Sequence, residues 1–306
     1  MSCLSWNCRG LGNPCTVQEL TRLVRVQAPS AVFCIETWLN EESLEFLRCR
    51  LHFYNKLVVP SNKKGGGLAL FWNNDFNLSV KSFSCNHIDS IIDEGTPEAW
   101  HLTFFYGAPE THRRIETWNL LRHLNQQFLL PWCCIGDFNE IVKNEEMHRR
   151  NQRPDRQMQG FRDAMDECDL MDLGYRGSPF TWCNNRDSLA STWVRLDRGL
   201  ATLSWVQKFP ATSVEHLDVI NSDHKCLLLT REPRGAQCFQ RNPFRFEEVW
   251  TSDEGCENTI QAAWGSAIPG SAMFKVAEKL KACKKHLGDW SRRSFGSVTR
   301  QLREKK

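Results

Sequence analysis

Six short polar motifs, each at the end of an apolar run, carry the residues of this chain that could do chemistry. The motifs are Leu4-Ser5-Trp6-Asn7, Cys34-Ile35-Glu36-Thr37, Phe105-Tyr106-Gly107, Ile135-Gly136-Asp137-Phe138-Asn139, Arg195-Leu196-Asp197-Arg198 and Ser222-Asp223-His224. Apolar runs of about four to eight residues are typical of buried strands. Polar residues just past strand ends are where α/β folds keep their sites. We therefore expect these carboxylates, amides, phenol and imidazole to lie in one cleft.

Together, these groups are suited to metal-assisted cleavage of a phosphodiester. Carboxylate and amide oxygens bind hard cations such as Mg²⁺, and a bound cation stabilises negative charge at phosphorus. Asp137 and Asn139 flank Phe138, so their side chains point to the same side of an extended backbone. His224 directly follows Asp223, and a carboxylate beside an imidazole fixes one tautomer and favours its charged form.

Each of these residues also has an ordinary structural interpretation. Glu36, at the end of a strand, is by default a surface residue, and Asn7 fits a turn in which it bonds its own backbone. Asp137 and Asn139 fit a simple turn after a buried strand, and Tyr106 fits core packing. Taken one at a time, the residues leave these interpretations open.

The elements that must position the motifs alternate between strand and helix. Strand patterns occupy residues 3–7, 31–36, 67–72, 99–106, 132–136 and 225–230. Helical spacing predicts helices over 14–26, 111–128 and 155–168. The first begins at Pro14, and proline is favoured in the first turn of a helix. Helices and strands mixed in this way predict a layered α/β fold.

Composition excludes several classes of protein. No apolar stretch approaches the roughly 20 residues of a membrane span, and no signal peptide is evident at the N-terminus. The 14 cysteines are scattered, and several lie inside apolar strands, where a reduced thiol acts as a small hydrophobe. We find no Cys-x-x-Cys unit of the zinc type. The sequence therefore predicts reduced thiols and an intracellular protein without an evident targeting signal.

The net charge of +3 is unevenly divided. Residues 275–306 hold 11 basic and 3 acidic residues, whereas the remainder holds 28 basic and 33 acidic residues. An acidic body suits cation binding and a basic tail suits a polyanion, although a solvated amphipathic helix explains the tail equally well. A composition break near Glu232-Pro233-Arg234-Gly235 predicts two parts, residues 1–231 and residues 232–306.

The order of the motifs resembles the endonuclease/exonuclease/phosphatase superfamily, which includes apurinic endonucleases and DNase I-like enzymes. The surrounding sequence is similar, more narrowly, to the endonuclease domain of plant LINE-type (non-LTR) retrotransposon polyproteins. The matching stretches are Trp6-Asn7-Cys8-Arg9-Gly10-Leu11, Phe105-Tyr106-Gly107, Gly136-Asp137-Phe138-Asn139-Glu140, Phe180-Thr181-Trp182 and Arg195-Leu196-Asp197-Arg198. The resemblance covers about residues 1–230.

The resemblance implies an architecture for each part of the chain. For residues 1–231 it implies a DNase I-like fold, a four-layer α/β sandwich of two packed mixed sheets with outer helices. Residues 232–306 would form a helical basic connector that stops before any reverse transcriptase.

The resemblance also implies a role for each motif residue. Glu36 would be the principal Mg²⁺ ligand, with Mn²⁺ as an alternative ion, and Asn7 and Asp223 would complete the metal site. Asp137 would handle a proton or align the nucleophile, and Asn139 would orient the attacking water or the phosphate.

The remaining roles concern the phosphate and the DNA. Asp197 would orient His224, which donates to the scissile phosphate, and Tyr106 would offer its phenol to the phosphate or the leaving group. A hairpin around residues 180–194 has a polar tip that would reach the DNA. Arg186 and Asn185 at this tip, together with Arg9, are the predicted DNA-binding residues, although an exposed loop arginine is an equally good interpretation of Arg186.

These implications predict a monomeric DNA endonuclease that nicks one strand and leaves a 3′-hydroxyl to prime reverse transcription. It would act in the nucleus if active and would come from a truncated retroelement copy. Two alternatives stay open. One is a phosphatase of the same superfamily, and the other is an inactive remnant that binds nucleic acid.

Overall fold

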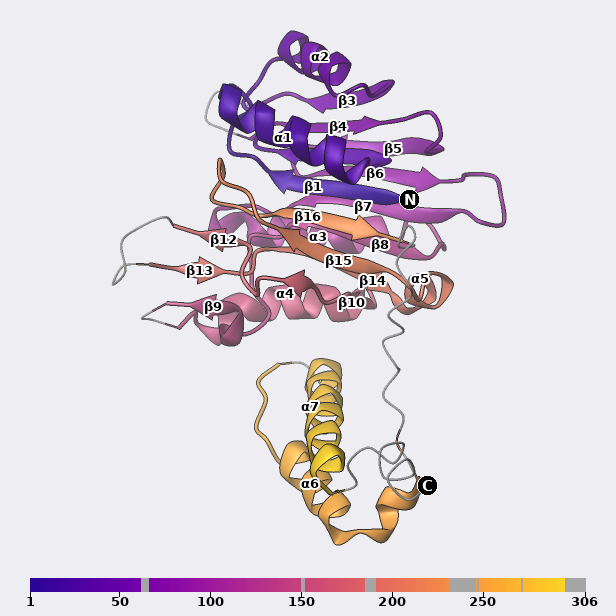
Figure 1. Cartoon of the computed structure of the whole chain (residues 1–306), viewed down its shortest axis with the longest axis vertical. Helices are drawn as coiled ribbons and strands as arrows, with labels where there is room; N and C mark the ends of the chain where they lie inside the picture. Colours follow the sequence, from indigo (N-terminus) through magenta and orange to yellow (C-terminus); the bar gives the residue numbers. More distant parts are fainter. Residues whose placement is uncertain are drawn as a thin grey trace, which may run out of the picture. The chain divides into compact units, whose positions relative to one another are not determined.

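Two mixed β-sheets face each other in the computed structural model (Figure 1), which describes residues 1–61, 66–149, 152–184, 191–231, 246, 248–270 and 272–294. The seven-stranded sheet has the order β11 (Arg176–Gly177), β15 (Ser213–Leu217), β16 (Cys226–Thr230), β1 (Ser2–Asn7), β2 (Ala31–Ile35), β4 (Leu68–Trp72) and β3 (Asn55–Val59). The six-stranded sheet has the order β10 (Leu170–Asp172), β14 (Asp197–Thr202), β8 (Trp132–Asp137), β7 (Trp100–Tyr106), β6 (His87–Ile92) and β5 (Leu78–Ser84).

Helices α1 (Pro14–Gln27) and α2 (Glu41–Arg50) cover the outer face of the seven-stranded sheet, and α3 (Arg114–Asn125) and α4 (Asp155–Glu167) cover that of the six-stranded sheet. The short helix α5 (Leu203–Lys208) instead contributes Trp205 to the core between the sheets. Two short 3-10 turns are η1 (Thr111–Arg113) and η2 (Asn144–Glu146). A small third sheet has the order β12 (Trp182–Cys183), β13 (Trp193–Val194) and β9 (Met147–His148). The helix predicted over 111–128 is thus divided between η1 and α3 and ends earlier.

Alternation along the strands creates the layers. In β1, Cys3 joins the core between the two sheets, whereas Leu4 and Trp6 pack outward with α1 and α2. On the other outer face, Phe138 stacks on Phe105 at 4.9 Å and on Phe161 of α4 at 5.4 Å between ring centroids. The predicted four-layer sandwich is therefore confirmed.

Strand direction brings the polar motifs to one edge. β1 runs parallel to β2, and β7 runs parallel to β8. The carboxyl ends of each pair therefore lie side by side. β16 is antiparallel to β1, and β14 is antiparallel to β8, so these two strands begin where their neighbours end. Residues at the ends of four strands and the starts of two others can therefore meet.

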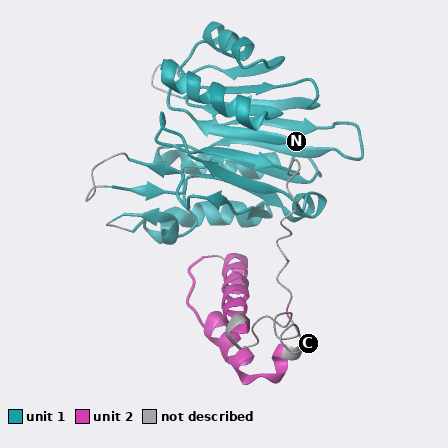
Figure 2. Ribbon diagram, viewed as in Figure 1, with its two compact units in different colours: residues 1–235 teal, residues 236–306 magenta. Residues whose placement is uncertain are grey.

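The chain divides into two compact units, Met1–Gly235 and Ala236–Lys306 (Figure 2). The second unit contains η3 (Glu248–Ser252), α6 (Glu254–Trp264) and α7 (Ala272–Ser294). Trp250, Cys256 and Leu287 form its small buried core. Among the helices described in either unit, none is both long and apolar enough to cross a membrane. The helical C-terminal extension is confirmed over these ranges.

Gly136 permits an unusually close contact between β7 and β8. It lies opposite Phe105 in the parallel register, and a Cβ atom added at Gly136 would be 1.9 Å from the backbone oxygen of Phe105. Because the colliding atom belongs to the backbone of a buried strand, no side-chain rotation relieves the overlap. The same contact fixes the strand end from which Asp137 projects.

We expect Gly136→Ala to lower the free energy of unfolding by about 3 kcal/mol, because β7 and β8 must separate to admit the methyl group. Urea unfolding followed by circular dichroism measures this loss. Gly12→Ala is the matched control, since the nearest atom to its added Cβ is Leu39 Cδ2 at 4.0 Å. Equal stability of the two variants would show that β7 and β8 can admit a methyl group at residue 136 without loss.

Candidate active site

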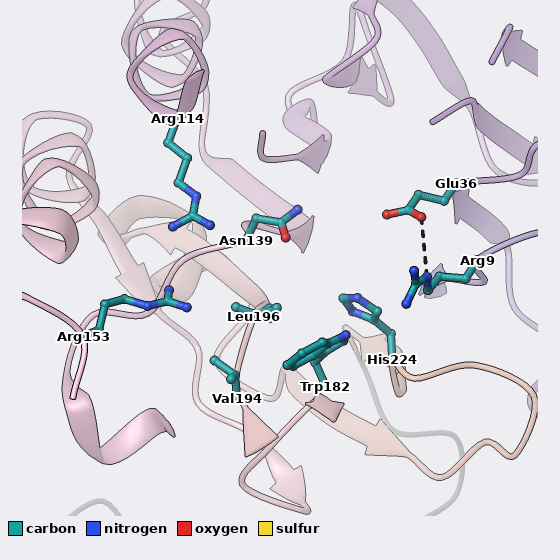
Figure 3. A pocket seen from close by; sticks show the side chains of 9 residues that line it. All are labelled: Arg9, Glu36, Arg114, Asn139, Arg153, Trp182, Val194, Leu196 and His224. Atoms are coloured by element: carbon teal, nitrogen blue, oxygen red, sulfur yellow. Dashed lines mark ion pairs between the residues drawn. The ribbon is translucent and has the colours of Figure 1, made fainter. Parts of the chain in front are cut away.

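The eight predicted catalytic and metal-binding residues come together at one edge of the two sheets. Three of them, Glu36, Asn139 and His224, line a cavity of about 250 Å³ (Figure 3). The eight are Asn7, Glu36, Tyr106, Asp137, Asn139, Asp197, Asp223 and His224. The cavity is lined by Arg9, Glu36, Arg114, Asn139, Arg153, Trp182, Val194, Leu196 and His224. Residues spread over most of the first unit therefore form one site.

Asn7 links the two sheets. Its side chain is fully buried, and its Nδ2 donates to Glu36 Oε1 at 3.0 Å and to Asp137 Oδ2 at 3.1 Å. Tyr106 OH donates to the same Glu36 oxygen at 2.9 Å. Burial, together with the nearby Glu36 carboxylate, raises the pKa of Tyr106. The phenol therefore keeps its proton and orients Glu36 by donating a hydrogen bond.

Two of these residues depend on a left-handed backbone. Glu36 and Asn139 both have φ of 55°, a conformation that is uncommon for residues with a side chain. The turn at Glu36 ends β2 one residue earlier than predicted. Asn139 N donates to Asp137 Oδ1 at 2.9 Å, and its Nδ2 donates to Gly107 O at 2.9 Å. The extended geometry predicted for residues 137–139 is therefore wrong, but Asp137 and Asn139 still lie together.

His224 and Asp197 form the predicted pair. His224 Nδ1 lies 2.9 Å from Asp197 Oδ2 and 3.9 Å from Asp137 Oδ2. The register of β14 against β8 places Asp197 opposite Asp137. Burial opposes the charge of His224, but attraction to Asp197 and Asp137 and the hydrogen bond to Asp197 outweigh it and raise the pKa of His224. The site therefore favours an imidazolium.

Asp137 is the most enclosed of these carboxylates. It is completely buried, and burial together with the Asp197 carboxylate raises its pKa, against the opposing effect of His224 and the hydrogen bond from Asn7. Oxygen or nitrogen atoms of Asp137, Asp197 and His224 lie within 4.8 Å of one another. The imidazolium offsets one of the two carboxylates, and His224 and Asp197 are already hydrogen-bonded to each other, so the group is suited to proton transfer.

Two of the predicted metal ligands, Glu36 and Asp223, lie next to the side chain of Arg9. Arg9 Nη1 forms a hydrogen bond with Asp223 Oδ2, and its Nε lies 4.0 Å from Glu36 Oε2. Trp182 Nε1 also donates to Asp223 Oδ2, at 2.9 Å. Asp223 Oδ1 is buried, and no described residue forms a hydrogen bond with it. Asn7 presents its nitrogen to both carboxylates, so its role as an oxygen ligand stays a prediction.

The predicted DNA-binding residues divide into two groups. Arg9 lies at the cavity with its side chain 51% exposed. Asn185 and Arg186 lie outside the described residues. The two strands that precede and follow them, β12 and β13, do pair as a hairpin.

Thr181 supports the site in a way that the sequence does not reveal. Its buried Oγ1 accepts hydrogen bonds from Leu196 N at 3.0 Å and from Asp197 N at 2.9 Å. The backbone that carries Asp197 is thereby held against β12. The Phe-Thr-Trp motif marks this position, but nothing in the sequence identifies the hydroxyl's partners.

Comparisons with known proteins agree with this arrangement. Residues 4–224 match the endonuclease/exonuclease/phosphatase family. The fold is similar to that of an AP endonuclease from Leishmania major, with a TM-score of 0.61 and 15% identity over 76% of this chain and 88% of that one. A search of the curated proteins finds no match.

Two further solved structures share the fold. One is a 3′-5′ exonuclease from Neisseria meningitidis, with a TM-score of 0.56 and 14% identity over 76% of this chain and 100% of that one. The other is the endonuclease domain of TRAS1, a telomere-specific non-LTR retrotransposon, with a TM-score of 0.52 and 15% identity over 75% of this chain and 97% of that one.

We expect Thr181→Val to lower the free energy of unfolding by about 2 kcal/mol, because two buried N–H groups lose their acceptor while the side-chain volume is kept. Thr181→Ser retains the hydroxyl and is the control. Thermal unfolding of both variants measures the difference. A Val variant as stable as the Ser variant would show that the hydroxyl does not hold this backbone.

Proposed function

The chain belongs to the endonuclease/exonuclease/phosphatase family, and from this we propose that it is a divalent-cation-dependent DNA endonuclease. The observation that carries the proposal is the hydrogen-bonded set formed by Asn7, Glu36 and Asp137, with the His224–Asp197 pair beside it. An acidic group that is open to a cavity and a cationic donor next to it suit cleavage of a phosphodiester.

The residues present fit a hard cation. Glu36 lines the cavity, and Asp223 Oδ1 is buried without a partner among the described residues. Carboxylate oxygens of this kind suit Mg²⁺ or Mn²⁺. Glu36 and Asp223 would hold the ion, and Asn7 would position Glu36 through its amide. When bound, the ion would supply positive charge to the phosphate oxygens.

The protein's own groups would divide the proton transfers. Asp137, oriented by Asn7 Nδ2 and Asn139 N, would take the proton of the attacking water. His224 lines the cavity while Asp197 accepts its Nδ1 proton. Its other ring nitrogen would donate to a phosphate oxygen as negative charge develops there. Tyr106 would hold Glu36 in place throughout.

We also propose a biological setting for this chemistry. The chain would nick one DNA strand as a monomer, in the nucleus, and leave a 3′-hydroxyl for target-primed reverse transcription. Support comes from the motifs around Arg9, Tyr106 and Trp182, which resemble plant LINE-type endonucleases, and from the shared fold with a retrotransposon endonuclease domain. The retroelement origin of residues 1–231 and the connector role of residues 232–306 belong to the same proposal.

The proposal predicts that the full chain converts supercoiled plasmid to the nicked form with Mg²⁺ and does not do so in EDTA. Glu36→Gln should slow nicking by about a hundredfold or more, because the cation loses its anionic ligand while the side-chain shape is kept. Glu42→Gln on the exposed start of α2 removes the same charge and should have no effect. Full activity in EDTA would overturn the metal requirement.

We expect Asp197 and His224 to act as one unit, because Asp197 works only through the imidazole that it orients. The double alanine variant should then nick DNA about as slowly as His224→Ala alone, since losses of coupled catalytic groups do not add. Single-turnover nicking rates of the wild type, both single variants and the double variant test this. Losses that multiply would mean that the two residues act separately.

A further inference from the structure

We propose that Arg114 and Arg153 form a second phosphate subsite in the cavity, which binds the phosphodiester group adjacent to the scissile one on the same DNA strand. This inference rests on the proposed function, because it assigns a substrate contact within that site. Neither arginine belongs to a motif singled out by the sequence.

Both guanidinium groups are attached to one buried carboxylate. Glu140 is fully buried; its Oε2 accepts from Arg114 Nη1 at 2.6 Å, and its Oε1 accepts from Arg153 Nη1. Gln157 Nε2 and Ile141 N also donate to Glu140, at 3.3 and 2.9 Å. Glu140 is therefore saturated with donors, and the group keeps one excess positive charge.

A neighbouring network in the same unit shows what a purely structural cluster looks like. There, Arg195 and Arg198 are paired with Glu146 and Asp172. Two guanidinium groups meet two carboxylates, so the charges cancel. Because buried charges are normally paired, the imbalance at Glu140 indicates that a further anion belongs there.

The excess charge faces the substrate cavity. Arg114 and Arg153 line the cavity on the side of Asn139 away from Glu36 and Arg9 (Figure 3). Their side chains are only 11% and 16% exposed, so a bound anion would be screened little by water. Burial and the neighbouring Arg153 lower the pKa of Arg114, against the attraction of Glu140 and, more weakly, of Asp137. An added anion would relieve this repulsion.

The arginines are held in place before any ligand arrives. Arg114 also donates from Nη2 to Pro109 O at 3.1 Å. Asn144 Oδ1 accepts from Arg153 N at 2.8 Å, and its Nδ2 donates to Arg153 O at 3.2 Å. Little side-chain entropy is lost on binding when donors are already ordered. Arginine's fork of N–H groups suits phosphate oxygens in particular.

Arg153 is the better residue to change, because Arg114 supports two backbone carbonyls as well. Arg153→Gln leaves Glu140 paired with Arg114, so the variant should fold. Arg122→Gln is the matched control: Arg122 pairs with Glu167 on the surface of α3 and does not line the cavity. Arg153→Lys keeps the charge. Thermal unfolding of each variant verifies the fold.

Binding of a short DNA duplex is measured in EDTA over a range of salt concentrations, so that no cleavage interferes. We expect Arg153→Gln to weaken binding about tenfold and to reduce the slope of log affinity against log salt by about 0.9, the value for one lost phosphate contact. Arg153→Lys should retain most of the slope. A slope for Arg153→Gln equal to that for Arg122→Gln would overturn the subsite.

The contacted phosphate is located with duplexes that carry a single neutral methylphosphonate at successive positions around a mapped nick. The wild type should lose affinity when the phosphate beside the nick is neutralised. Arg153→Gln, which already lacks this contact, should bind the neutralised and the unmodified duplex equally well. A terminal phosphate as the true ligand would instead appear as a preference for 5′- or 3′-phosphorylated ends that Arg153→Gln removes, which contradicts the internal assignment.

The two proposals fail in different ways. Nicking by the wild type, with no effect of Arg153→Gln on salt slope or methylphosphonate sensitivity, rejects the subsite and leaves the nuclease intact. DNA binding with the expected effect of Arg153→Gln on the salt slope, but no nicking in Mg²⁺, supports phosphate binding by the two arginines and rejects the nuclease. A wild type that does not bind DNA rejects both.

Discussion

One buried amide holds the site together. Asn7 is the last residue of β1, and its Nδ2 bonds Glu36 from its own sheet and Asp137 from the opposite sheet. A buried carboxylate is costly unless donors meet it, so Asp137 depends on this nitrogen, which also holds the half-buried Glu36. The amide can reach them only because parallel strand pairs end together at one edge. The position of the two acids therefore depends on both the direction of the strands and the packing of the two sheets.

The buried polar clusters of the first unit differ in net charge, and we relate this difference to their roles. The Arg195 and Arg198 network cancels its charges and stiffens the support beneath the cavity. The His224 side instead keeps an imidazolium among buried carboxylates, and the Glu140 side keeps a surplus of guanidinium. Low-dielectric surroundings strengthen every one of these interactions. A polyanionic strand lying across the cavity would meet the acidic side at Glu36 and the basic side at Arg114 and Arg153.

The sequence predicts those parts whose signal is local. β2 and β8 are nearly continuous apolar runs, β1 is shorter and mixed, and a polar residue lies at or directly after the end of each. β5 lies at a sheet edge and carries three serines and the exposed Lys81, and β14 carries Arg198 and Gly199, so the sequence predicts neither as a strand. Contacts such as that from Asp197 N to Thr181 join distant segments. Residue types reveal candidate chemistry, but partners of this kind exist only once the chain is folded.

The first and last strands of the seven-stranded sheet in chain order lie side by side, since β16 pairs with β1. During synthesis, which delivers the N-terminus first, β2 is available to β1 early, but β16, its partner on the other side, is made only when the first unit is nearly complete. His224 immediately precedes β16 and arrives with it. A nascent chain on the ribosome thus contains Glu36 and Asp137 long before His224. A chain that stops before residue 224 would therefore lack the group that pairs with Asp197.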